Sequence, residues 1–167
     1  MGDYVIAVDV GGTNIRVALL NGQLDILKKE TAFTMEFHSA DSFFAHMAEM
    51  VHDVDSKGIA GHLGMALPAP WVSGNKRITD ITNIPYLEGV QVEEVYGYLA
   101  PYKVYIENDV NVIALLESDR GAARNFNNSL YVTVSTGISS GIIINNRIFH
   151  GAHGYAGEIG SMIISKA

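Results

Sequence analysis

The tract Asp9-Val10-Gly11-Gly12-Thr13-Asn14 constrains the fold more than any other part of the sequence, because it places two adjacent glycines between two strand-like runs. Residues 4–9 and 15–20 are rich in β-branched and aliphatic residues, and Asn21-Gly22 is a strong hairpin signal. A third, looser run covers residues 24–34. We therefore expect the chain to open as an antiparallel meander.

Helical and strand-like segments alternate after the meander, as in an α/β fold. Residues 39–57 carry apolar side chains at helical spacing, and residues 61–67 predict a buried strand. Residues 68–87, which contain Pro, Gly, Asn and Thr, are expected to form a long functional loop. The remaining elements are expected in the order helix, strand, helix, over residues 90–99, 104–106 and 110–123.

The opening pattern returns near the end of the chain. A strand-like run over residues 130–134 leads into a Ser-Thr-Gly turn, and a second apolar run follows. Placing Asp9 on Ser135 also places Gly11 on Gly137. This correspondence indicates one internal repeat of a strand, a phosphate-binding turn and a strand.

These patterns predict a complete α/β domain over residues 1–123 and the truncated start of a similar second domain over residues 124–167. Residues 162–164 are expected to form a third apolar strand of the second domain. No apolar run approaches the ~20 residues that a membrane helix needs. The N-terminus has no basic, apolar leader pattern, so we expect a cytoplasmic protein without a membrane partner.

Composition excludes several classes of site. The formal net charge of −7 disfavours a nucleic-acid partner, whose phosphates would be repelled. The chain has no cysteine, which excludes disulfides and thiolate zinc sites. The 6 histidines are scattered without metal-ligand spacing, and we interpret them as structural or surface residues.

The Gly-Gly turn is a candidate phosphate site. Gly11 and Gly12 lack side chains, so backbone N–H groups can approach a phosphate there, and Thr13 adds a hydroxyl donor. Asp9 ends the preceding strand, where it can hold Mg²⁺ through water or orient a transferred phosphoryl group. The alternative is an ordinary hairpin turn in which Asp9 is a local acceptor. The second turn at residues 135–141 favours the phosphate site.

Glu107-Asn108-Asp109 stands between a predicted strand and a predicted helix. A carboxylate there can accept the proton of a substrate hydroxyl, and Asn108 can bond a neighbouring hydroxyl. The alternative is structural, because Asn and Asp are preferred at helix N-caps. Capping alone would explain the tripeptide, and only its combination with the phosphate turns favours catalysis.

The stretch 151–160 is rich in small residues and predicts a tight loop packed against a ligand or another backbone. Glu158 is a candidate acceptor for sugar hydroxyls. The alternative is a glycine-rich connection with Glu158 in solvent. Trp71, in the long loop, could pack on a sugar ring, but we prefer the interpretation that it covers the edge of the core.

Together these elements resemble the ROK family of sugar kinases and sugar-responsive repressors. The resemblance covers nearly the whole chain and rests on the order and spacing of five motifs: DVGGTNIR at the start, TNIP at 82–85, END at 107–109, STGISSGIIINNRIFHGAHG at 135–154 and AGEIG at 156–160. It implies an α/β fold of the actin-like ATPase (ribonuclease H-like) type. Such a fold has a mixed sheet with an antiparallel meander and flanking helices.

The resemblance implies ATP and Mg²⁺ bound in a cleft between two domains, and phosphorylation of a hexose or hexosamine hydroxyl, usually on C6. It implies one phosphate site at Asp9, Gly11, Gly12 and Thr13, and a second at Thr136 and Gly137. Asp109 matches the catalytic base. Asn108 and Glu158 match sugar-binding positions, and Asn83 lies in a loop expected to border the sugar.

Three departures from the family pattern bear on this prediction. The second turn reads Ser135-Thr136-Gly137-Ile138-Ser139-Ser140-Gly141 where the family is richer in glycine, so its side chains either crowd the phosphates or replace lost donors. Ser161 stands where the family usually has a histidine, and we expect no zinc ligands in this chain. The family's adenine-binding helices would lie beyond Ala167, so the fragment is expected to be poorly active.

Two other functions are weighed against the kinase. A non-catalytic sugar sensor, as in the repressor branch, usually carries a helix-turn-helix segment upstream, whereas Met1 stands just before the first strand here. An ATPase or acetate-kinase-like protein fits the END and AGEIG motifs less well. The kinase is favoured, with a small-molecule sugar as its partner and a homodimer left open.

Overall fold

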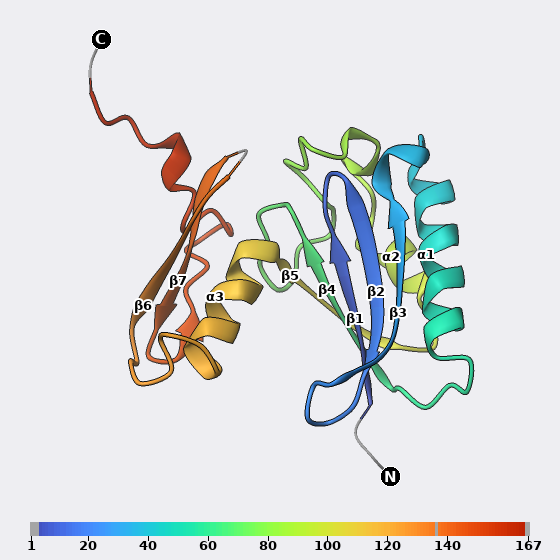
Figure 1. Cartoon of the computed structure of the whole chain (residues 1–167). Helices are drawn as coiled ribbons and strands as arrows, with labels where there is room; N and C mark the ends of the chain where they lie inside the picture. The colour runs from blue at the N-terminus through green and yellow to red at the C-terminus, as the bar shows by residue number, and fades with distance from the viewer. Residues whose placement is uncertain (1–3, 136, 166–167) are drawn as a thin grey trace. The chain divides into compact units, whose positions relative to one another are not determined.

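A computed structural model describes residues 4–135 and 137–165 (Figure 1). Packing divides the chain into two compact units. The first contains the residues up to Ala69 together with Ser73–Glu107, and the second contains Pro70–Val72 together with the residues from Asn108 onward. The division falls one helix before the boundary expected after residue 123. The functional assignment of the two predicted domains stays a prediction.

The first unit is built on a mixed five-stranded sheet in the order β3-β2-β1-β4-β5. Its strands are β1 (Val5–Val10), β2 (Asn14–Leu20), β3 (Ile26–Phe33), β4 (His62–Leu67) and β5 (Lys103–Asn108). β1 and β2, and β2 and β3, pair antiparallel, whereas β4 runs parallel to β1. The expected antiparallel meander is confirmed.

Helix α1 (Ala40–Val54) supplies much of the core of the first unit. The Ser39 side chain accepts a hydrogen bond from the Ser42 N–H and begins the helix, as expected of an N-cap. The buried side chains recur at helical spacing: Phe43, Phe44, Met47, Met50, Val51 and Val54. Figure 1 shows α1 alongside β3, and the helix also packs on β2 and on α2 (Val92–Tyr98).

Asp55, which follows α1, is a buried carboxylate with only 3% of its surface exposed. Its oxygens accept hydrogen bonds from the Ile59 N–H at 2.9 Å, the Ala60 N–H at 3.0 Å and the Tyr102 hydroxyl at 3.2 Å. These bonds join the end of α1 to the loop before β4 and to the segment before β5. Buried charge is tolerated when its acceptors are satisfied in this way.

The second unit combines helix α3 (Asp109–Asp119) with a three-stranded antiparallel sheet of β6 (Ser129–Val134), β7 (Ile138–Ile144) and β8 (Arg147–Ile148). α3 packs closely on β7 because Gly141 has no side chain. A Cβ at Gly141 would lie 2.4 Å from the Ala114 Cβ. Asn145 and Asn146, with φ of 52° and 61°, form the expected hairpin turn.

The expectation of a third apolar strand in the second unit is wrong. Met162, Ile163 and Ile164 do not form a strand: they follow the 3₁₀ turn Ile159–Ser161 with 63%, 89% and 92% of their surface exposed. An apolar run becomes a strand only where another strand offers its backbone, and none of the described strands lies beside this segment.

The repeat holds for elements but not residue by residue. β1 and β2 pair up to Val10 and Ile15, whereas β6 and β7 pair up to Val134 and Ile138, which encloses a shorter turn. Ser135 therefore lies in the turn, while Asp9, its expected counterpart, lies in a strand. Within the described residues, no helix combines the length and apolar character needed to span a membrane.

Candidate functional site

The residues expected to act on phosphate and sugar fall into two groups, one in each unit. The first group contains Asp9, Gly11, Gly12, Thr13 and Asn83, and the second contains Asn108, Asp109, Gly137 and Glu158. Thr136, assigned to the second phosphate turn, lies outside the described residues. Each group is described by itself.

The turn between β1 and β2 presents backbone donors. It is closed by a hydrogen bond of 2.9 Å from the Gly11 N–H to the Asn14 carbonyl. Among residues 4–135 and 137–165, neither the Gly12 N–H nor the Thr13 N–H makes a backbone hydrogen bond. These donors, next to the Asp9 carboxylate, suit a phosphate with its metal ion.

Thr34, which follows β3, holds the carbonyl side of this turn. Its N–H donates to the Thr13 carbonyl at 2.9 Å, and its hydroxyl donates to the Gly11 carbonyl at 2.7 Å. The Tyr86 hydroxyl in turn donates to the Thr34 carbonyl at 2.9 Å, and burial raises the Tyr86 pKa. Sequence reasoning missed both residues, because nothing in their local pattern links them to a turn so distant in the chain.

Asn83, in the long loop, lies against the same turn. A Cβ at Gly12 would come within 3.2 Å of the Asn83 Cβ, so only glycine fits there without displacing the loop. The Asn83 residue is itself exposed. Its predicted contact with a sugar stays a prediction, whereas its position beside the first turn is a feature of the structure.

Arg16 is the cross-strand partner of Asp9, and its guanidinium Nη1 lies 2.8 Å from Asp9 Oδ2. Both side chains are about half exposed, at 47% and 52%, so the pair adds little to stability. Asp9 thus accepts a local hydrogen bond, which is what the alternative interpretation as an ordinary hairpin turn predicts. Its carboxylate also faces solvent. Sequence reasoning missed this pairing. It follows from a hairpin in which four residues separate Val10 from its partner Ile15.

Asn108 and Asp109 begin α3 in the second unit. The Asn108 side-chain carbonyl accepts a hydrogen bond from the Asn111 N–H at 3.0 Å, so the capping interpretation is correct for Asn108. Asp109 Oδ1 accepts from the Val110 N–H at 2.8 Å, and the residue is half-buried. The positive end of the helix dipole stabilises a carboxylate at this position, which is the form a general base requires.

The glycine-rich loop at residues 151–160 packs on another backbone. The sequence predicted packing on either a ligand or a backbone. The Gly157 carbonyl accepts hydrogen bonds from the Ser140 N–H at 2.7 Å and the Ser140 hydroxyl at 2.9 Å. Farther along the loop, a Cβ at Gly160 would lie 2.3 Å from the Ile138 carbonyl oxygen. Glu158 is half-buried and lies in the sequence between these two points of attachment to β7.

The second turn is open on one side. The Ser135 N–H donates to the Gly137 carbonyl at 2.9 Å, and a Cβ built on Gly137 would meet nothing within 4 Å. Ser140 is not in this open region: it is 2% exposed and bonded to the glycine-rich loop. Its hydroxyl is bonded to the Gly157 carbonyl rather than exposed at the turn.

Trp71 is buried, with 4% of its surface exposed, which agrees with the expectation that it covers the edge of a core. Gly154 packs on it: a Cβ at Gly154, whose φ is +83°, would lie 2.8 Å from the Trp71 backbone nitrogen. The loop 151–160 is thus fixed at both Trp71 and β7.

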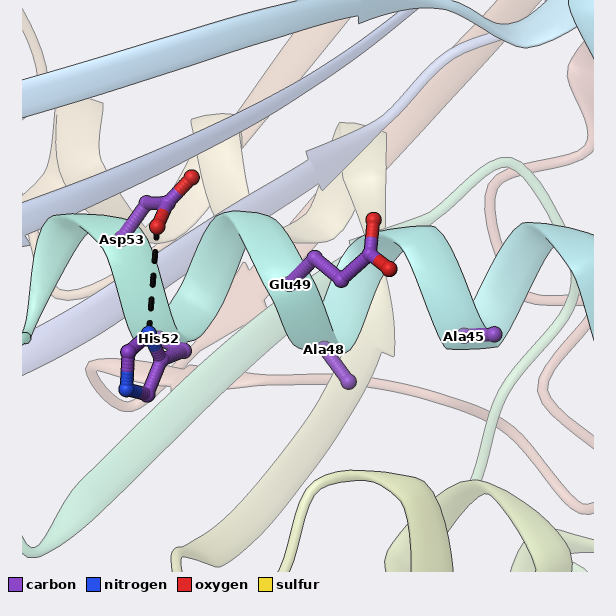
Figure 2. Close-up of a pocket in the computed structure, with 5 residues that line it drawn as sticks. All are labelled: Ala45, Ala48, Glu49, His52 and Asp53. Carbon is purple, nitrogen blue, oxygen red and sulfur yellow. Dashed lines mark ion pairs between the residues drawn. The ribbon is translucent and has the colours of Figure 1, made fainter.

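A shallow hollow on the outer face of α1 contains none of the predicted site residues (Figure 2). It is lined by Ala45, Ala48, Glu49, His52 and Asp53, and the His52–Asp53 pair, 3.8 Å apart, is well exposed. No group of three His, Cys, Asp or Glu side chains in the described part of the chain is arranged to hold a metal ion. We do not assign a site to this hollow.

Comparison with known proteins gives consistent matches over nearly the whole chain. A family model for the ROK family matches residues 5–167. A glucokinase from Thermotoga maritima is 28% identical over 160 residues, which is 96% of this chain and 50% of that protein. A xylose repressor from Bacillus spizizenii is 29% identical over 167 residues, covering 96% of this chain and 42% of the repressor.

A ROK family glucokinase from Streptomyces griseus, solved in complex with glucose and AMPPNP, has a TM-score of 0.82 and is 23% identical. The match covers 97% of this chain and 51% of that one, and at this identity it establishes the fold. The expected α/β fold of the actin-like ATPase type is confirmed. The chain spans about half the length of the curated relatives that it matches.

Proposed function

The chain belongs to the ROK family, and on this premise we propose that it carries phosphate- and sugar-binding elements of an ATP-dependent sugar kinase. The proposed substrate is a hexose or hexosamine, phosphorylated on the C6 hydroxyl, with ATP and Mg²⁺ as cofactors in the cytoplasm. Relatives named glucokinase support the general activity. The observation that carries the proposal is the first turn, where the Gly12 and Thr13 N–H groups make no backbone hydrogen bond within the described residues.

In this proposal the two turns act on phosphate. The Gly12 and Thr13 N–H groups donate to phosphate oxygens, and Thr34 keeps the turn in the conformation that presents them. Asp9 would hold Mg²⁺ through water, and Thr136 and Gly137 would bind phosphate at the second turn. Mg·ATP supplies the transferred phosphoryl group when it is bound.

The proposed sugar-binding residues are Asn83, Asn108, Asp109 and Glu158. Asp109 accepts the proton of the attacking hydroxyl, because its position at the start of α3 favours the carboxylate form. Asn108 binds a sugar hydroxyl and also caps α3. Its side-chain carbonyl accepts the hydrogen bond from the helix, and its amide N–H₂ is a donor. Glu158 accepts hydrogen bonds from sugar hydroxyls.

A sugar sensor without catalysis is the second candidate function, because a xylose repressor matches this chain as closely as the glucokinase does. The two candidates differ in one measurable respect. A kinase consumes ATP in the presence of its sugar, whereas a sensor binds the sugar and releases no ADP.

The test uses the whole protein that carries this chain, assayed for ADP release with Mg·ATP and a panel of hexoses and hexosamines. We expect turnover with at least one sugar, and we expect Asp109→Asn to lower it by about 10²–10⁴-fold. Glu107→Gln is the matched control, because it removes the neighbouring carboxylate and should preserve turnover. Wild-type turnover in Asp109→Asn would contradict the base assignment, and sugar binding without ADP release would favour the sensor.

A further inference from the structure

The loop that carries Glu158 is attached to β7 through one carbonyl group. The Gly157 carbonyl oxygen accepts three hydrogen bonds, from the Ser140 N–H at 2.7 Å, the Ser140 hydroxyl at 2.9 Å and the Ile159 N–H at 2.7 Å. Two of the three donors belong to Ser140. The carbonyl therefore has a fixed direction, and the peptide that leads into Glu158 shares it, because the peptide group is planar.

Steric contact prevents this attachment from shifting. Gly157 has φ of +101°, and a Cβ there would lie 1.9 Å from the Ser140 carbonyl oxygen. The two backbones are thus in direct contact, and any side chain at Gly157 would separate them. Ser140 is only 2% exposed, so its hydroxyl is shielded from water that could compete for the bond.

Ser140 also belongs to the strand that leaves the second turn. β7 begins at Ile138, and Ser140 pairs with Val132 of β6 in the hairpin that the turn closes. One residue thus links the strand next to Gly137 with the loop that carries Glu158. No functional role for Ser140 follows from the proposed reaction itself.

We propose that Ser140 is a positioning residue for sugar binding, which acts by fixing the Gly157 carbonyl and thereby the orientation of Glu158. The inference rests on the proposed role of Glu158 in binding a sugar hydroxyl. Removal of the hydroxyl leaves two N–H donors on the Gly157 carbonyl. The loop therefore stays attached but loses the one side-chain hydrogen bond among the three that fix this carbonyl.

The test measures sugar and nucleotide binding separately, by calorimetry on the whole protein, with glucose, N-acetylglucosamine and Mg·AMPPNP as probes. In Ser140→Ala the sugar dissociation constant should rise about tenfold, as expected for one lost hydrogen bond, while the AMPPNP constant stays unchanged. Ser140→Thr, which keeps a hydroxyl, should retain most of the sugar affinity. Ser129→Ala on β6 is the matched control and should alter neither constant.

A double-mutant cycle separates positioning from a general structural effect. If Ser140 acts through Glu158, Ser140→Ala should weaken sugar binding much less in a Glu158→Gln background than in the wild type. Additive losses, unchanged sugar affinity in Ser140→Ala, or equal losses for sugar and nucleotide would each overturn the proposal.

Amide hydrogen exchange distinguishes failure of this inference from failure of the proposed function. If the wild type binds no sugar of the hexose and hexosamine panel, the proposed role of Glu158 is wrong, and so is the sugar-positioning role built on it. The structural link is then decided separately. Faster exchange at the Ile159 amide in Ser140→Ala, with the β6 and β7 amides unchanged, supports the link, and unchanged exchange at Ile159 refutes it.

Discussion

Gly12 is a residue of the first turn at which a side chain would meet the long loop. A Cβ there would lie 3.2 Å from the Asn83 Cβ and would project beside the N–H donors proposed to bind phosphate. We expect Gly12→Ala to weaken Mg·AMPPNP binding at least about tenfold, because a displaced donor loses its charge-assisted bond. Calorimetry measures the affinity, and thermal unfolding checks that the first unit stays folded.

Gly64→Ala is the matched control for Gly12→Ala. Gly64 lies within β4 of the same sheet, and a Cβ built there would meet nothing within 4 Å. Its affinity for AMPPNP should equal that of the wild type. Equal affinities for all three proteins would mean that the first turn does not bind the nucleotide.

Asp55 offers a second prediction at the residue scale, about stability. Asp55→Ala leaves the buried Ala60 N–H and the partly buried Ile59 N–H without their acceptor. The free energy of unfolding should fall by about 3 kcal/mol, as expected when buried donors lose their partner. Urea unfolding measures the change. Asp53→Ala, at an exposed position on α1, should change it by less than about 0.5 kcal/mol.

Tyr102 makes the stability of the first unit depend on pH in alkaline solution. Burial, the negative charge of Asp55 and the hydrogen bond to Asp55 raise the Tyr102 pKa above its ordinary value of 10.0. The stabilisation that the protonated Tyr102 hydroxyl provides is therefore fully present below pH 10. It is lost as pH rises through the pKa of Tyr102 in the folded state. Urea midpoints of Tyr102→Phe should be lower at neutral pH and decline less above pH 10. Parallel profiles for the two proteins would contradict this role.

At the scale of secondary-structure elements, local patterns predicted most of the fold. The Gly-Gly turn and Asn21-Gly22 predicted the meander, and the Ser39 cap with its apolar spacing predicted α1, because these signals lie within one element. The prediction of a strand at residues 162–164 was wrong because a strand is not determined within one element. A strand depends on a partner backbone elsewhere in the chain, which apolar character alone cannot supply.

Packing between elements was the part that sequence could not predict. α3 groups with β7 because Gly141 lets Ala114 approach, a contact between residues far apart in the sequence. The packing division therefore lies before α3, whereas the sequence pattern predicted a boundary after residue 123. In the candidate site, Asp9 and Gly12 stand out by their motif, whereas Thr34 and Ser140 acquire their roles only from the folded chain.

At the scale of the whole molecule, alternate residues of β6 form an exposed apolar face. Leu130, Val132 and Val134 are 59%, 46% and 74% exposed, and β6 is an edge strand of its sheet. Exposed apolar surface at a sheet edge favours association between copies. We expect the 167-residue chain to self-associate at micromolar concentration and to bind the dye ANS.

The matched variant places charge on this face without disturbing the core of the unit. Val134→Lys combined with Val132→Thr keeps a β-branched residue in the strand and adds a positive charge at its end, where the wild-type residue is largely exposed. Sedimentation velocity over a range of concentrations should show less association and ANS emission should fall, with the far-UV circular dichroism unchanged. If the wild-type chain sediments as a monomer throughout and binds no ANS, the exposed face of β6 does not drive association.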